Sequence, residues 1–228
     1  MDESQYEALR QRMIAEVVAE AVFLTPRLGK SSFNARVIEV MSEVPRHQFV
    51  PVQLQQFSYV NQPLPIGCGK TVSQPFIVAL MTDLLDPQPG DSVLEVGAGA
   101  GYQAAVLSRM VKQVYSIDMI EELALSAGKR LKRLGYSNVV VGLGNGYHGW
   151  PEHAPYDKII VTAAPELIPP ALLEQLKPGG RLVIPTGIAD AQQLVLAIKD
   201  ASGSISIREV LPVRFSELEQ GKAVSGTA

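Results

Sequence analysis

The chain has 228 residues, of which 46% are hydrophobic and 19% are charged, the balance of an ordinary globular protein. Its formal net charge of −3 argues against a protein whose main task is to bind nucleic acid, because such proteins carry a basic surface. Cys68 is the one cysteine, which excludes an internal disulfide and a thiolate metal cluster and favours a reducing, cytoplasmic location.

The first 50 residues predict two amphipathic helices. Apolar residues recur at helical spacing at Tyr6, Leu9, Met13, Val17, Ala21 and Leu24. Acidic residues interrupt this segment, so we expect no export signal, and no apolar run reaches the roughly 18 residues of a membrane span. A second helix is predicted from Asn34 to Val44, where Pro45 ends it because the residue before a proline avoids helical geometry.

A proline-rich stretch and a third helix follow. Residues 53–70 contain Pro63 and Pro65 and are expected to be extended and irregular. The third helix is predicted from Gln74 to Leu85. Pro75 suits its first turn, and the Ser73 side chain could cap it.

From residue 89 the pattern alternates between strands and helices. Strands are predicted at residues 92–96, 113–117, 138–143, 158–162 and 181–185, helices at 102–110, 121–134 and 168–176, and a closing antiparallel pair at 193–198 and 204–213. Parallel strands connected by helices imply an α/β sheet covered on both faces. We therefore divide the chain into a helical extension with active-site residues (1–88), a cofactor-binding core (89–215) and a tail (216–228).

The turn after the first core strand carries the most specific signal. An apolar strand leads into Gly97, Gly99 and Gly101 and then directly into a helix. Glycines suit a sharp turn that a ligand approaches closely, and the helix start behind them offers free amides. A dinucleotide-binding turn would place its third glycine at position 102, which is Tyr102 here. This spacing, with Glu95 before it, resembles the S-adenosyl-L-methionine motif of Rossmann-like methyltransferases.

An acidic residue ends the next strand. Asp118 lies 17 residues after Gly101, where a carboxylate accepts hydrogen bonds from both hydroxyls of a ribose. It could also cap the helix predicted from residue 121. No cluster of His, Asp or Glu indicates a metal, since His47, His148 and His153 are scattered. We therefore expect no metal.

Six blocks between Val44 and Phe215 resemble the protein-L-isoaspartate O-methyltransferases of the bacterial type. They are residues 44–51, 63–67, 71–75, 93–107, 159–165 and 176–185. The Thr-x-Ser-Gln-Pro block at residues 71–75 is the part specific to this family.

The resemblance implies a Rossmann-like class I methyltransferase fold with a mostly parallel, seven-stranded sheet, helices on both faces and an N-terminal helical extension. It implies transfer of a methyl group from S-adenosyl-L-methionine to the α-carboxylate of L-isoaspartyl residues in damaged proteins and peptides. This transfer starts the repair of the damaged residue through a succinimide. Ser73 matches the family's active-site serine. The cofactor-binding positions that follow from the motifs are Thr71, Ser73, Glu95, Gly97, Gly99, Gly101, Asp118, Asn145 and Gly146.

The chain departs from the family pattern in two places. The family has Gly-Asp-Gly where this chain has Gly144-Asn145-Gly146, and the aspartate there accepts the adenine amino group. We expect Asn145 to weaken cofactor binding by about 1 kcal/mol or less and its change to Asp to restore it. After Phe215 the family continues Val-Pro-Leu, and this chain has residues 216–218 as Ser-Glu-Leu.

Three other functions stay open at this point. A related carboxyl O-methyltransferase could act on one specific peptide or a small acid. A protein that binds the cofactor without catalysis is disfavoured by the retention of Ser73, Glu95 and Asp118, and an oxidoreductase that uses NAD is disfavoured by Tyr102. The oligomeric state cannot be predicted from the sequence.

Overall fold

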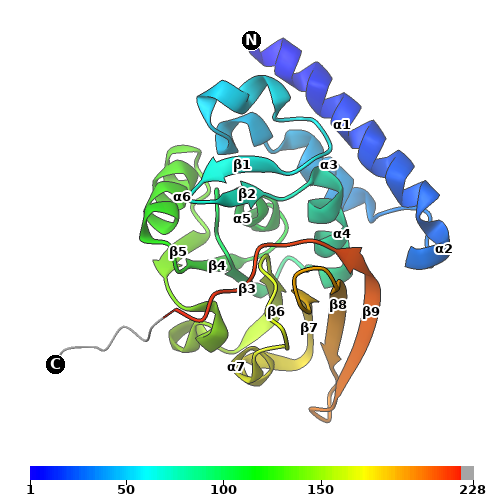
Figure 1. Cartoon of the computed structure of the whole chain (residues 1–228), viewed down its shortest axis with the longest axis vertical. Coiled ribbons are helices and arrows are strands. Elements are labelled where there is room, and N and C mark those ends of the chain that lie inside the picture. The colour runs from blue at the N-terminus through cyan, green and yellow to red at the C-terminus, as the bar shows by residue number, and fades with distance from the viewer. Residues whose placement is uncertain (222–228) are drawn as a thin grey trace.

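A seven-stranded sheet forms the centre of the computed structural model, which describes residues 1–221 (Figure 1). The strand order is β5-β4-β3-β6-β7-β8-β9, with β3 to β7 parallel to one another and β8 and β9 antiparallel. The strands are β3 (Ser92–Val96), β4 (Gln113–Asp118), β5 (Val139–Leu143), β6 (Tyr156–Val161), β7 (Leu176–Thr186), β8 (Gln192–Lys199) and β9 (Ile205–Val213). The α/β fold expected from the sequence is therefore confirmed.

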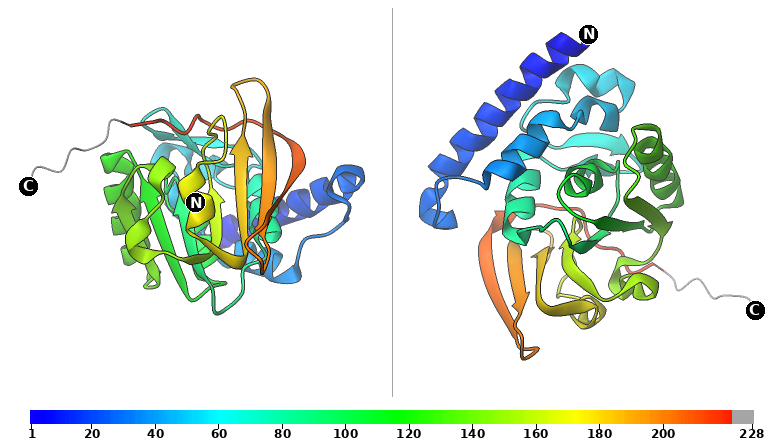
Figure 2. Two further views of the ribbon diagram at one scale, coloured as in Figure 1. Left: turned by 90° about the horizontal axis from the view of Figure 1, so that it is seen from below. Right: turned by 180° about the vertical axis from the view of Figure 1, so that it is seen from behind.

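Alternation along the strands creates two apolar cores. Val93 of β3 packs into a core with the helices of one face, whereas its neighbour Leu94 packs into a second core on the opposite face. Successive side chains of a strand point to opposite faces, so a sheet buried on both faces needs continuous apolar runs. The core helices are α4 (Pro75–Leu85), α5 (Tyr102–Ser108), α6 (Glu121–Arg133) and α7 (Pro170–Glu174). Figure 2 shows these helices from two further directions.

The N-terminal extension packs against the sheet through α4. Its helices are α1 (Glu3–Phe23), α2 (Thr25–Leu28) and α3 (Ala35–Glu43), and α1 and α3 both contact α4. Asp2 caps α1 by accepting a hydrogen bond from the Gln5 amide, and the Asn34 side chain caps α3. Four of the six stripe residues predicted for α1 are buried, and Leu9 and Leu24 are half-buried. No helix within residues 1–221 is long and apolar enough to cross a membrane.

The stretch expected to be irregular contains regular structure. Short 3-10 helices cover Arg46–Phe49 and Val52–Phe57, and β1 (Leu64–Gly67) and β2 (Lys70–Val72) form an antiparallel hairpin. Further 3-10 turns cover Gly146–His148 and Pro151–His153. Pro65 is accommodated because this two-stranded hairpin is separate from the main sheet, so its edges need no further partner.

The expected helix at residues 168–176 is wrong in length. Only Pro170–Glu174 is helical, and β7 begins at Leu176, five residues earlier than predicted. Gly179 and Gly180 lie inside the strand, which has a register irregularity opposite Tyr156 and Lys158 of β6. Bulges of this kind accept extra residues that a two-residue periodicity does not reveal.

Candidate active site

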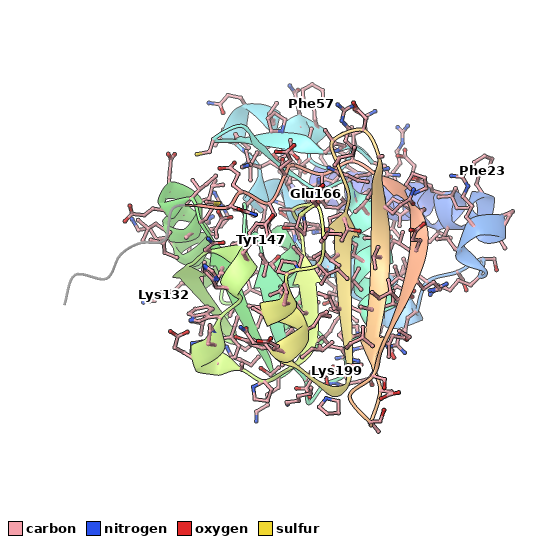
Figure 3. The ribbon with its side chains drawn as sticks, turned by 60° about the horizontal axis from the view of Figure 1, so that its bottom comes forward. Phe23, Phe57, Lys132, Tyr147, Glu166 and Lys199 are labelled. Atoms are coloured by element: carbon pink, nitrogen blue, oxygen red, sulfur yellow. The ribbon has the colours of Figure 1, made fainter. Side chains whose placement is uncertain are left out.

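One large cavity lies at the carboxyl ends of the parallel strands. Figure 3 shows Tyr147 and Glu166, in the loops after β5 and β6, at this edge, and Lys199, the last residue of antiparallel β8, at the opposite edge. The cavity has a volume of about 640 Å³. Its walls are the β3–α5 turn, the junction of β2 and α4, the loops after β4, β5 and β6, and residues 211–219. Ligands bind at this edge of open parallel sheets, and the volume suits a molecule of cofactor size.

The β3–α5 turn is held by the neighbouring strands. The amides of Gly97 and Ala98 both donate to the carbonyl oxygen of Ile117, at 2.8 and 3.0 Å. Gly97 has a φ of +95°, and a Cβ there would overlap the Thr162 hydroxyl, which donates to the Gly97 carbonyl oxygen at 2.7 Å. A side chain at position 97 would thus both strain the backbone and break this contact.

Asp118 ties the glycine turn to the end of β4. Its Oδ2 accepts a hydrogen bond from the Gly99 amide at 2.8 Å, and its Oδ1 accepts one from the Ile120 amide at 2.9 Å. The side chain is buried and lines the cavity. A carboxylate oxygen can accept more than one hydrogen bond, so both oxygens remain able to bind hydroxyl groups of a ligand. The cap residue of α6 is Ile120, and no side chain caps this helix, so the capping role considered for Asp118 is wrong. Asp118 instead joins the glycine turn to the chain before α6 and stays available to a ligand.

Glu95 is fully buried at the cavity floor. Ser116 donates to its Oε2, and its Oε1 has no hydrogen-bond partner among residues 1–221. Burial raises the pKa of Glu95 to about 8, and the nearby charge of Asp118 adds to the increase. At neutral pH the side chain is therefore mostly a neutral acid, and it adds no second negative charge beside Asp118.

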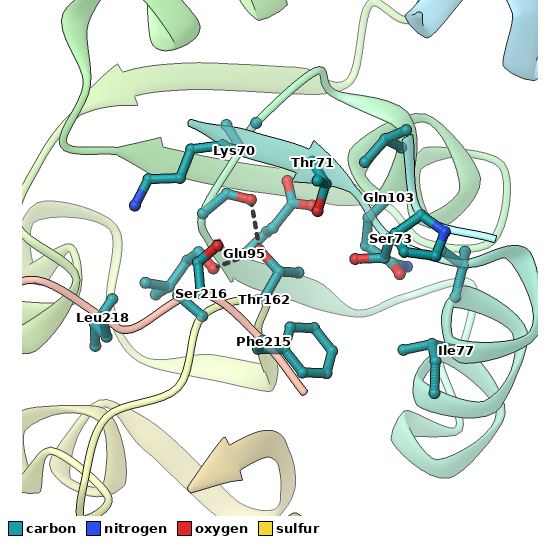
Figure 4. A pocket seen from close by; sticks show the side chains of 18 of the residues that line it. Lys70, Thr71, Ser73, Ile77, Glu95, Gln103, Thr162, Phe215, Ser216 and Leu218 are labelled. Carbon is teal, nitrogen blue, oxygen red and sulfur yellow. Dashed lines mark hydrogen bonds between the residues drawn. The ribbon is translucent and has the colours of Figure 1, made fainter. Parts of the chain in front are cut away.

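Ser73 lies where β2 leads into α4, and its hydroxyl is free. No group within residues 1–221 hydrogen-bonds its Oγ, and the residue is half-buried in the cavity wall. Figure 4 shows Ser73 and Gln103 on one side of the cavity and Lys70 and Leu218 on the other, with Glu95 and Thr162 between them. A free hydroxyl in a largely apolar wall is suited to bind a polar acceptor.

Ser73 does not cap α4, the structural role that its sequence position left open. The cap position belongs to Gln74, and the Phe76 amide donates instead to Asn61 Oδ1 at 3.0 Å. Asn61, in the preceding loop, thus supplies from outside the helix the acceptor that a capping serine would have provided. The Ser73 hydroxyl therefore has no role in capping, and the Phe76 amide is already bound to Asn61.

Arg46 fixes the backbone beside Ser73. It is completely buried, and its guanidinium donates to the carbonyl oxygens of Ser58 and Ser73, both at 2.8 Å. The same group lies over the Tyr102 ring, 4.8 Å from its centroid. Burial lowers the pKa of Arg46 to about 10, so it stays charged at neutral pH. Arg46 links the N-terminal extension to both Ser73 and the first residue of α5.

The segment after β9 closes the cavity; residues 214–219 are called the strap. At its start the Gln192 side chain is hydrogen-bonded to both backbone groups of Phe215, at 2.6 and 3.1 Å. Further along, Ser216 and Leu218 pair with the backbone of Ala164 after β6. Near its end Glu219 forms a 2.8 Å ion pair with Lys70 of the hairpin. The strap therefore spans from the sheet to the hairpin across the cavity.

The remaining predicted positions differ in where they lie. Thr71 and Gly146 line the cavity, and a Cβ on Gly146 would overlap Val96 and meet Leu218 at 2.9 Å. Gly101 does not line it; its φ of +87° starts α5, and a Cβ would crowd Leu131 at 3.0 Å. Gly101 therefore serves the turn and the packing of α5 on α6.

Asn145 does not line the cavity either. Its Oδ1 accepts a hydrogen bond from the Tyr147 amide at 2.9 Å, and its Nδ2 donates to the Gly221 carbonyl at 3.4 Å. Both ends of the amide are thus used within the chain. A contact of Asn145 with adenine stays a prediction, and this geometry argues that its change to Asp would tighten cofactor binding little.

Sequence reasoning missed several cavity residues. Glu20, Gln103 and Thr162 line the cavity, yet none belongs to a motif that marks a ligand. Glu20 was visible only as a charge interrupting the apolar stripe of α1, and Thr162 only as the end of a strand. Arg46 lay within one of the family-like blocks, but its hydrogen bonds join segments 12 and 27 residues away. Such contacts leave no periodic signal.

These features fit S-adenosyl-L-methionine. The glycine turn leaves room that a Cβ would fill, Asp118 offers carboxylate oxygens at the ribose position, and Glu95 is neutral. Within residues 1–221 no group of His, Cys, Asp or Glu forms a potential metal site.

Comparison with known proteins decides the family. The sequence model of the family "Protein-L-isoaspartate(D-aspartate) O-methyltransferase (PCMT)" matches residues 21–223. The chain belongs to this family. The enzyme class, the cofactor S-adenosyl-L-methionine and the isoaspartyl substrate class expected from the sequence are therefore confirmed.

Curated relatives cover nearly the whole enzyme. It is 54% identical to protein-L-isoaspartate O-methyltransferase 1 of Polaromonas sp. over 97% of this chain and 94% of that one. It is likewise 54% identical to protein-L-isoaspartate O-methyltransferase 2 of Syntrophobacter fumaroxidans, over 95% and 88%. α1 lies mostly before the region matched by the family model but within the alignment to the Polaromonas protein.

Solved structures support the same fold. A protein-L-isoaspartate O-methyltransferase superposes with a TM-score of 0.74 at 29% identity, over 88% of this chain and 65% of that longer chain. A putative protein-L-isoaspartate O-methyltransferase from Plasmodium falciparum, solved in complex with S-adenosyl-L-homocysteine, superposes with a TM-score of 0.72 over 89% and 98%. Its identity of 23% supports the fold alone.

Proposed function

We propose that this enzyme methylates the α-carboxylate of L-isoaspartyl residues in damaged proteins and peptides, with Ser73 as the residue that binds the acceptor. The methyl ester then closes to a succinimide, whose hydrolysis returns part of the product to normal aspartyl linkages. The observation that carries the proposal is that the free Ser73 hydroxyl and the β3–α5 glycine turn line one continuous cavity.

S-adenosyl-L-methionine supplies, when bound, a methyl group on a positively charged sulfonium. The chain's part is to hold that group in place: the glycine turn provides a close-fitting backbone surface, and Asp118 provides acceptors for the ribose hydroxyls. The neutral Glu95 completes the floor without adding a charge that would need a partner.

Ser73 would orient the acceptor. A carboxylate is already a nucleophile at neutral pH, so the reaction needs no strong general base within the cavity. It needs the carboxylate held close to the methyl group and partly freed of water. A hydrogen bond from Ser73 Oγ to one carboxylate oxygen leaves the other oxygen for attack, and Arg46 keeps the Ser73 backbone in place.

The strap would limit the access of water. Leu218 and Phe215 line the cavity from the strap, so they would shield the reacting groups from water. The removal of water strengthens the hydrogen bond from Ser73 and lowers the cost of bringing an anion to the methyl group.

Matched peptides test the function. Two peptides that differ only in an isoaspartyl or an aspartyl linkage are incubated with S-adenosyl-L-methionine labelled in its methyl group. We expect label in the isoaspartyl peptide alone, released as methanol in mild base because it is held as an ester. Equal labelling of both peptides, or labelling only of small acids, would replace the proposal with another carboxyl methyltransferase.

The same proposal places the enzyme in the cytoplasm, acting on proteins and peptides and not on nucleic acid. The single, exposed Cys68 and the net charge of −3 support it. Fractionation of cells followed by the peptide assay tests the location.

A further inference from the structure

Glu20 lies at the acceptor end of the cavity, on the last turns of α1. We propose that Glu20 selects isoaspartyl peptides that carry a cationic side chain, lysine or arginine, next to the damaged residue. This inference rests on the proposed function and specifies its substrates.

The position of Glu20 follows from its hydrogen bonds. Its Oε2 accepts from Asn61 Nδ2 at 2.7 Å and from Gln74 Nε2 at 3.4 Å. Gln74 directly follows Ser73, and Asn61 also caps α4 through the Phe76 amide. Glu20 is therefore held against the segment that carries Ser73.

The charge of Glu20 is not used within the described chain. Among residues 1–221 no Lys, Arg or His lies within ion-pair distance of it. The other acidic residues of the cavity differ: Asp118 binds two backbone amides, Glu219 pairs with Lys70, and Glu95 is neutral. Glu217 is exposed on the strap. Glu20 is thus the half-buried carboxylate of the cavity whose charge is unpaired within residues 1–221.

The surroundings of Glu20 strengthen its effect on a bound peptide. Leu24, Ile77 and Pro63 line the same part of the cavity, and apolar walls reduce the screening of a charge by water. Among residues 1–221 two cations line the cavity: Lys70 is paired with Glu219, and Arg214 has an 85% exposed side chain that water screens far more. The field at the acceptor end is therefore set by Glu20, and it attracts a cation and repels an acidic neighbour.

Three isoaspartyl peptides, identical except for Lys, Gln or Glu beside the isoaspartyl residue, test the inference. One such set of three peptides varies the residue before the isoaspartyl residue, and a second set varies the residue after it. All are assayed at saturating S-adenosyl-L-methionine. For the unmodified enzyme we expect KM to rise from Lys to Gln to Glu, by roughly five-fold between the extremes, with little change in kcat. The ratio should shrink at high salt because the interaction is electrostatic.

Variants of Glu20 show whether this residue causes the dependence of KM on the neighbouring side chain. Glu20→Gln keeps an oxygen for Asn61 and Gln74, so it should fold and bind cofactor normally while the KM values become equal. Glu20→Lys should reverse their order. Glu16→Gln is the matched control, since Glu16 lies one turn earlier on α1, pairs with Arg12 and does not line the cavity. It should keep the preference.

Two results would overturn the inference alone: no dependence of KM on the neighbouring residue, or an undiminished preference in Glu20→Gln. A preference lost equally in Glu16→Gln would also overturn it, because the effect would then belong to the net charge of the protein. The absence of methylation on every isoaspartyl peptide would overturn the proposed function together with this inference.

Discussion

The Ser73 hydroxyl has no hydrogen-bond partner among residues 1–221, since Asn61 caps α4 and Arg46 binds the Ser73 carbonyl oxygen. Ser73→Ala should therefore leave folding and cofactor affinity unchanged. We expect it to lower kcat on an isoaspartyl peptide by about 10- to 100-fold, the effect of losing one hydrogen bond to a charged acceptor.

The measurement compares turnover, the cofactor dissociation constant and thermal unfolding between the Ser73→Ala variant and the unmodified enzyme. Ser42→Ala is the control, because the Ser42 hydroxyl bonds only the Glu39 carbonyl within α3 and does not line the cavity. Near-normal turnover in Ser73→Ala would remove Ser73 from the mechanism.

Glu95 makes stability depend on pH. In the unfolded chain its carboxyl ionises near the ordinary value of 4.5, whereas in the fold it keeps its proton up to about pH 8. Between these values the native state binds more protons than the unfolded state, so the free energy of unfolding falls as pH rises. The contribution of Glu95 is complete below about pH 4.5 and is lost as pH rises through 8.

Glu95→Gln should remove this dependence. The expected slope from Glu95 is about 1 kcal/mol per pH unit between pH 5 and 8. Urea unfolding of both proteins at several pH values measures it, and the difference between the two curves isolates Glu95 from all other groups. Parallel curves would show that Glu95 is ionised in the native state.

At the scale of elements, Gln192 holds the strap through one side chain. It is buried on β8 and bonds both backbone groups of Phe215. Gln192→Leu conserves volume but leaves these groups without partners, at a cost of about 1–3 kcal/mol for the closed strap. We expect cofactor affinity to fall several-fold and proteolysis within residues 214–219 to accelerate.

Gln193→Leu is the matched control, since adjacent side chains of a strand point to opposite faces and Gln193 is half-exposed. It should change neither property. Equal cofactor affinity in Gln192→Leu and the unmodified enzyme would show that the strap does not contribute to cofactor binding.

The elements that could be predicted are those with strong periodicity. β3 is predicted at Ser92–Val96 and lies there, because a mostly apolar run between Gly90 and Gly97 has few alternatives. The β1–β2 hairpin was missed because it buries only part of each strand, and its prolines indicate irregular structure. The start of β7 was missed because its glycines lie in a bulge rather than in a turn.

For the candidate site, the sequence predicted the residues that form contiguous motifs. The glycine turn, Asp118 and Ser73 do line one cavity. Asn61, Arg46 and Glu20 act across sequence separations of 12 to 54 residues, and only the fold brings these segments together. The capping role considered for Ser73 failed for this reason, since the residue that performs it lies 15 positions from the amide it binds.

At the scale of the whole molecule, the extension and the core share one face of the sheet. Leu80 and Leu85 of α4 belong to the same apolar core as Ile160 and Val183 of the sheet. The division of the chain at residue 88 into an extension and a cofactor-binding core stays a prediction. Because α4 covers β6 and β7, we expect residues 89–228 alone to lack a cooperative unfolding transition.

Calorimetry and near-ultraviolet circular dichroism measure the cooperativity of unfolding of that fragment and of the full chain. A sharp transition in the fragment would show that the core folds independently of the extension.

The cavity walls come from distant parts of the chain: Glu20 lies on the first helix, and the strap ends at residue 219. A protein is synthesised from its N-terminus, and its early segments begin to fold before the later ones exist. Here Ser73 and the glycine turn leave the ribosome well before the strap. The site therefore stays open to water throughout translation, and a ribosome-bound chain that ends before residue 214 should be inactive even with its sheet complete.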